Sequence, residues 1–112
     1  MDNRIEQLLA AFQSNGWKFV GSADVSSDWW FRDILQLEST WRPIGTPLYL
    51  TLLTDPQILE EKIIWCIGIS SEIPNGKSFH YIDQIALNDI KRTDLKNFVG
   101  KVSKIVLKEP GL

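Results

Sequence analysis

The chain has 112 residues, of which 44% are hydrophobic and 23% charged, and its formal net charge is −2. This length is typical of one domain, and the composition is that of a globular protein rather than a disordered or membrane-embedded one. The acidic balance provides no overall positive field and therefore disfavours nucleic-acid binding. We expect a single soluble α+β domain over residues 1–112.

Two features of the chain bear on its location. Cys66 is the only cysteine, so no intramolecular disulfide can form. The N-terminal residues are polar and lack the apolar stretch of a signal peptide, and no apolar run approaches the roughly 20 residues that cross a bilayer. We therefore expect a cytoplasmic protein without a membrane segment.

The N-terminal segment has the spacing of an amphipathic helix. Apolar side chains recur at i, i+3, i+4 and i+7, which predicts a helix over residues 3–15 that buries Ile5, Leu8, Leu9 and Phe12. Asn15-Gly16 suits the left-handed residue that ends many helices. A short β-segment, Trp17 to Val20, follows and is expected to end at Gly21-Ser22; its pairing partner stays open.

The next segment predicts a hairpin. Residues 29–41 are rich in aromatic and branched side chains, which favours a long strand with a bulge near Arg32-Asp33. Pro43 and Gly45 suit a turn over residues 42–45. The resulting register pairs Trp41 with Thr46, Ser39 with Leu48, Leu37 with Leu50, and Leu35 with Leu52.

Paired residues share a face of a sheet, so the register divides this hairpin into two surfaces. The apolar surface comprises Leu35, Leu37, Trp41, Leu48, Leu50 and Leu52. The opposite surface comprises Gln36, Glu38, Thr40, Tyr49 and Thr51.

A second hairpin is expected further along the chain. Alternation over residues 63–70 predicts a half-buried strand, Asn75-Gly76 is typical of a type I′ turn, and a final strand is expected over residues 78–86. This turn pairs Ile69 with Ile82, Ile67 with Gln84, and Trp65 with Ala86. On the reverse side it pairs Gly68 with Asp83, and Ser70 with Tyr81.

The last element is a second amphipathic helix, capped by Thr93 or Asp94 and stopped by Pro110-Gly111. Its apolar arc comprises Leu95, Phe98, Val99, Val102, Ile105 and Val106. The order α-β-β-β-β-β-α predicts an antiparallel sheet of four to five strands with both helices on one face. The other face would then be uncovered.

Few residues offer chemistry. His80 is the only histidine, Cys66 lies far from it in the predicted register, and no phosphate-binding glycine loop occurs. We therefore predict no catalytic residue, metal or cofactor. Glu38 and Asp83 are both expected on the outer face, where they are interpreted as solvated charges rather than an acid–base pair. The lysines and arginine of residues 91–108 are likewise interpreted as a solvated helix face.

Two functional hypotheses remain. The first is a non-catalytic protein-interaction module, with another protein or a second copy as partner, that uses the aromatic edge at Trp29-Trp30 or the outer sheet face. That face would present Tyr49, Tyr81, Thr51, Leu53 and Ile85. The second is a small-ligand site or minor enzyme at one end of the sheet. Its lining would be Glu38, Trp41, Arg42, Tyr49 and Asp83.

Overall fold

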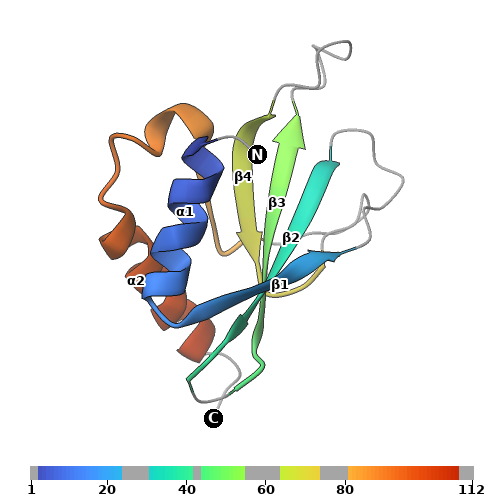
Figure 1. Cartoon of the computed structure of the whole chain (residues 1–112), viewed down its shortest axis with the longest axis vertical. Coiled ribbons are helices and arrows are strands. Elements are labelled where there is room, and N and C mark those ends of the chain that lie inside the picture. Colours follow the sequence, from blue (N-terminus) through green and yellow to red (C-terminus); the bar gives the residue numbers. More distant parts are fainter. Residues whose placement is uncertain (1–2, 24–30, 42–43, 55–63, 74–80, 109–112) are drawn as a thin grey trace.

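The computed structural model describes residues 3–23, 31–41, 44–54, 64–73 and 81–108 (Figure 1). It confirms the predicted α+β fold, with a helix at each end of the chain and five strands between them. The elements are α1 (Asn3–Ser14), β1 (Trp17–Ala23), β2 (Phe31–Ser39), β3 (Pro47–Thr54), β4 (Ile64–Ser70), β5 (Asp83–Ala86), the 3-10 turn η1 (Leu87–Asp89) and α2 (Leu95–Lys108).

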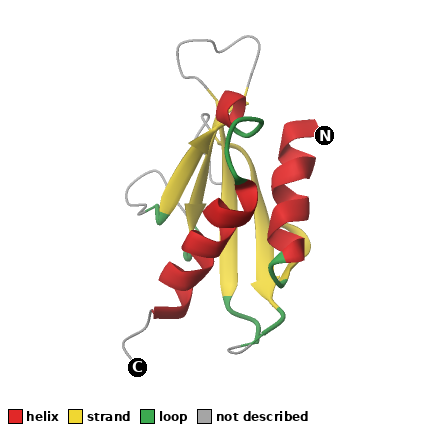
Figure 2. Cartoon of the chain, turned by 90° about the vertical axis from the view of Figure 1, so that its left-hand side faces the viewer, coloured by secondary structure: helices red, strands yellow, loops and turns green. Residues whose placement is uncertain are grey.

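The five strands form one antiparallel sheet in the order β1-β2-β3-β4-β5. Each strand therefore pairs with its neighbour in sequence, as short connections favour. Figure 2 shows α1 and α2 on the same side of this sheet, where they also contact each other. The fold thus has two layers, and we call the sheet face turned away from the helices the outer face.

The core lies between the sheet and the two helices. It contains the predicted face of α1, the predicted face of α2 apart from Ile105, and the apolar surface of the first hairpin, including fully buried Leu37, Leu48 and Leu50. Trp17 begins β1 within this core, and its indole Nε1 donates a hydrogen bond of 2.9 Å to Ser103 Oγ on α2. The bond satisfies a buried donor and joins the first strand to the last helix.

β1 is longer than predicted because Gly21 does not end it. The strand pairs with β2 from Trp17 to Ala23, with a register shift between Phe19 and Gly21. Gly21 has a φ of 137°, and the intervening Val20 is 43% exposed. This arrangement is a β-bulge, which lets the chain continue along β2 after one unpaired residue.

The β2–β3 register is shifted by two residues from the predicted one. Leu37 pairs with Leu48 and Leu35 with Leu50, whereas Ser39 closes the hairpin by bonding to Thr46. Because side chains alternate with a period of two, a shift of two leaves every face assignment intact. The predicted pairs are wrong and the predicted faces are correct; the bulge between Phe31 and Asp33 is also confirmed.

The β4–β5 register is shifted by one residue, which reverses the faces. Ile67 pairs with Ile85 and Ile69 with Asp83, so the predicted pairing of Ile67 with Gln84 is wrong. Ile85 belongs to the buried core rather than the outer face, and Asp83 lies on the helix side. The observed register places an isoleucine instead of a glutamine against the core, which burial favours. The Asn75-Gly76 turn and His80 lie outside the described residues.

The outer face is buried over its central strands, contrary to the expectation of an uncovered surface. Ile34 and Thr51 are fully buried, and Tyr49 is 8% exposed. Ile34 and Tyr49 form a second small apolar cluster with Ala23 and Leu53 beside them. The centre of this face is therefore not available as a broad contact surface.

Candidate functional site

The structure does not bring the residues of the predicted end-of-sheet pocket together. Glu38 alternates with the buried Leu37 and so lies on the outer side of β2, whereas Asp83 lies on the helix side of β5. The two carboxylates therefore occupy opposite faces of non-adjacent strands. At these positions the two carboxylates cannot act as acid and base on the same substrate. Trp29, Trp30 and Arg42 lie outside the described residues.

Trp41 is a packing residue in this structure. Its ring lies 4.8 Å from that of Trp17 in an edge-to-face arrangement. Gly16 lies beneath the same ring with a φ of 89°, and a Cβ at that position would be 2.5 Å from Trp41 Cε3. Glycine is therefore required here both by backbone conformation and by the close approach of the indole. These contacts place Trp41 against the core, where it packs at the end of the sheet beside α1.

Tyr81 covers part of the outer face of β4. A Cβ at Gly68 would lie 2.3 Å from Tyr81 Cε1, so the tyrosine ring rests directly on the glycine backbone. Burial, together with a smaller contribution from the neighbouring Cys66, raises the pKa of Tyr81 to about 12. The phenol is therefore a neutral packing group near pH 7 rather than an acid or base.

The thiol of Cys66, on the same outer face, is a potential nucleophile, but its buried surroundings lower its reactivity. The thiol is buried, and burial raises its pKa although backbone hydrogen bonds from Ile67 and Ile85 oppose the shift. Its sulfur lies 3.7 Å from Gln84 Oε1. Because the thiolate is the reactive form, a raised pKa makes this cysteine a poor nucleophile.

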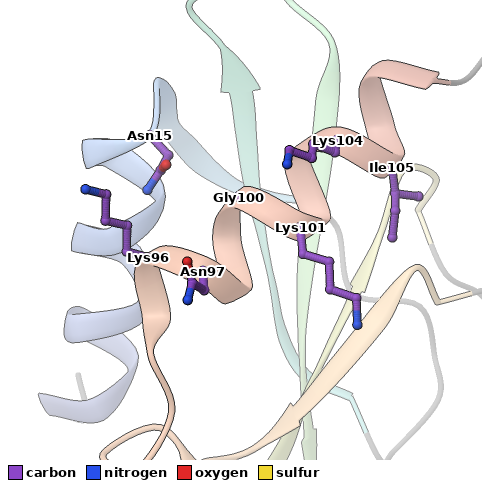
Figure 3. Close-up of a pocket in the computed structure, with 7 residues that line it drawn as sticks. All are labelled: Asn15, Lys96, Asn97, Gly100, Lys101, Lys104 and Ile105. Atoms are coloured by element: carbon purple, nitrogen blue, oxygen red, sulfur yellow. The ribbon is translucent and has the colours of Figure 1, made fainter.

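A groove lies on the helix side of the described residues. It has a volume of about 560 Å³ and lies between the C-terminal end of α1 and one face of α2. Figure 3 shows the side chains that surround it. The lining residues are Asn15, Lys96, Asn97, Gly100, Lys101, Lys104 and Ile105; we call this hollow the lysine groove.

The helical repeat explains the arrangement of the lysine groove. Lys96, Gly100 and Lys104 are four residues apart, so they form one row along α2. Gly100 has no side chain, and a Cβ there would meet nothing within 4 Å. The hollow therefore lies over Gly100, with a lysine at each end of the row and Asn15 contributed by α1 (Figure 3).

The charges of the lysine groove are only weakly compensated. Lys101 approaches Asp83 at 3.9 Å, but its side chain is 71% exposed, so this pair contributes little. Lys96 and Lys104 are exposed and have no ion-pair partner among the described residues. Residues 91–108 carry six cations and one carboxylate, a net +5, which leaves −7 for the rest of the chain.

The two groove asparagines are held by the helix ends. Asn15 Nδ2 donates to the carbonyl of Ala11 at 2.8 Å, at the end of α1. Asn97 Nδ2 donates to Asp94 Oδ2 at 3.0 Å, while Asp94 Oδ1 accepts the Asn97 backbone N–H and so caps α2, as predicted. Local hydrogen bonds thus hold the two asparagines in the groove walls.

The sequence contained the lysines of this site but not its shape. The six basic residues over 91–108 have the pattern of a solvated helix face, which is the usual state of such a pattern. The missed signal is Gly100, a residue of low helix propensity that leaves a gap in the row of side chains between Lys96 and Lys104. The contribution of Asn15 depends on how α1 packs beside α2, which the sequence pattern alone does not define.

The chain as a whole resembles no known protein in three comparisons: a scan of family models, a search of curated proteins and a search of solved structures found no match. No helix of the described residues is long and apolar enough to cross a membrane. Within the same residues, no three His, Cys, Asp or Glu side chains are grouped as metal ligands would be.

Proposed function

We propose that the protein is a non-catalytic interaction module that binds an anionic partner in the lysine groove. The observation that carries the proposal is the row Lys96–Gly100–Lys104, in which two lysines without a carboxylate partner among the described residues flank a vacant helix surface. An anion placed there gains attraction from both cations without displacing an existing ion pair.

Burial makes the outer sheet face a weaker candidate for the contact surface. A dimer formed through that face would need exposed apolar area, yet Ile34 and Thr51 are already fully buried there. The lysine groove, by contrast, combines exposed charge with a volume of about 560 Å³, which lies within the range of ordinary ligand sites.

The proposal is tested by isothermal titration calorimetry with poly-L-glutamate at low and at physiological salt. The test variant is Lys96→Gln/Lys104→Gln, and the matched control is Lys91→Gln/Arg92→Gln, which removes the same charge outside the groove. Two exposed charge contacts together account for about twofold to thirtyfold in affinity. We expect a loss of this size in the groove variant and a much smaller loss in the control.

The control separates site binding from general attraction. If both variants weaken binding equally, the anion responds to the net charge of the helix rather than to the groove. If neither weakens it, the anion binds elsewhere on the chain. Either outcome contradicts the proposed function.

A further inference from the structure

We propose that the anionic partner is an extended acidic segment of a polypeptide, whose backbone lies over Gly100 and whose carboxylates contact Lys96 and Lys104. This inference rests on the proposed function and adds the class of partner and the way it is seated. It follows from the cost of Gly100, the spacing of the two lysines and the composition of the groove.

Gly100 has no structural reason to be glycine. It lies inside α2, it is not one of the residues with positive φ, and an added Cβ would meet open space. A glycine in a helix interior destabilises the helix by about 1 kcal/mol relative to alanine. Because no packing or backbone conformation offsets this cost, we attribute the missing side chain to close approach of a ligand to the helix backbone.

The lysine spacing matches an extended peptide. Lys96 and Lys104 are eight residues apart on α2, so their Cα atoms are separated by about 12 Å at a helical rise of 1.5 Å per residue. Carboxylate side chains at i and i+4 of an extended strand point to the same side and are separated by about 13 Å. One extended segment can therefore contact both lysines while its middle residues pass over Gly100.

The composition of the groove favours a peptide over a nucleic acid. Single-stranded nucleic acids are usually held by aromatic side chains that stack on bases, and none of the seven lining residues is aromatic. Ile105 instead provides apolar surface and Asn15 and Asn97 provide amides, which suit a peptide backbone.

The test uses two end-blocked nonapeptides of identical composition, each with two glutamates among Ser and Gly residues. The glutamates are separated as i and i+4 in one peptide and adjacent in the other. We expect the spaced peptide to bind at least about threefold more tightly to the parent protein, because only it reaches both lysines. An equal affinity for the two peptides would overturn the proposed seating.

A second arm fills the space over Gly100. Gly100→Gln adds an uncharged side chain with high helix propensity, so the urea midpoint should rise while affinity for the spaced peptide falls by about tenfold. Unchanged affinity in a folded variant would overturn the close approach at Gly100. Gly100→Ala provides an intermediate case with a smaller loss.

The remaining outcomes separate this inference from the proposed function. Binding of oligothymidylate but of neither peptide, abolished by Lys96→Gln/Lys104→Gln, would overturn the acidic-segment inference and leave the anion-binding module intact. Failure of every anion, including poly-L-glutamate, to bind would overturn both.

Discussion

Replacing Gly68 with alanine is expected to destabilise the protein, although the same change in an open strand would stabilise it. The new Cβ would lie 2.3 Å from Tyr81 Cε1 and 2.7 Å from two further ring atoms. Ordinary contact begins near 3.4 Å, so the ring must move by about 1 Å. Overpacking of this kind costs about 1–3 kcal/mol, whereas relief of glycine flexibility returns about 0.5–1 kcal/mol.

At the midpoints of these two ranges, the net effect is a loss of about 1 kcal/mol in the free energy of unfolding. It is measured by urea unfolding with tryptophan fluorescence as the signal. In the double variant Gly68→Ala/Tyr81→Ala the clash is absent, so the alanine at position 68 should cost less there than in the parent; the difference is the coupling energy. A Gly68→Ala variant as stable as the parent would refute the proposed packing of Tyr81 on β4.

Three further predictions concern the outer face. Thr51 is fully buried, and its Oγ1 has no hydrogen-bond partner among the described residues. Thr51→Val should therefore raise the free energy of unfolding by about 1 kcal/mol in urea titrations. A decrease would show that the hydroxyl has a hydrogen-bond partner. Burial raises the pKa of the Cys66 thiol, so its reaction with a disulfide reagent at pH 8 should be at least about tenfold slower in the folded protein than in urea; equal rates would contradict its burial. The pKa of Tyr81 is raised from an ordinary 10.0 to about 12 in the folded state. The free energy of unfolding should therefore fall as the pH rises from about 10 to 12. An equally steep fall in Tyr81→Phe would contradict this assignment.

Alternation of side chains made the fold predictable from sequence. Leu35, Leu37, Leu48 and Leu50 could be assigned to the core because a period of two determines which side chains share a face. The two-residue error in register left that assignment untouched. Its cause is a contact between distant segments: Thr40 donates both its backbone N–H and its hydroxyl to the carbonyl of Gly16, so the chain leaves the sheet after Ser39.

The second hairpin shows where local turn rules are insufficient. Asn75-Gly76 indicated a register in which Ile67 faces Gln84, but core burial selects the neighbouring alignment with Ile85. That change of one residue moved Asp83 to the helix side and so separated it from Glu38. The predicted placement of Glu38 and Asp83 on one face depended on this register, whereas the lysine groove depends on the packing of α1 beside α2.

The most direct test of the lysine groove as the contact surface is a 15N-labelled NMR titration with the spaced acidic peptide. Saturable chemical-shift changes are expected at the backbone amides of Lys96, Gly100 and Lys104, with the Tyr49 and Thr51 amides unaffected. Changes confined to Tyr49 and Thr51 would instead place the contact on the outer sheet face and contradict binding in the lysine groove.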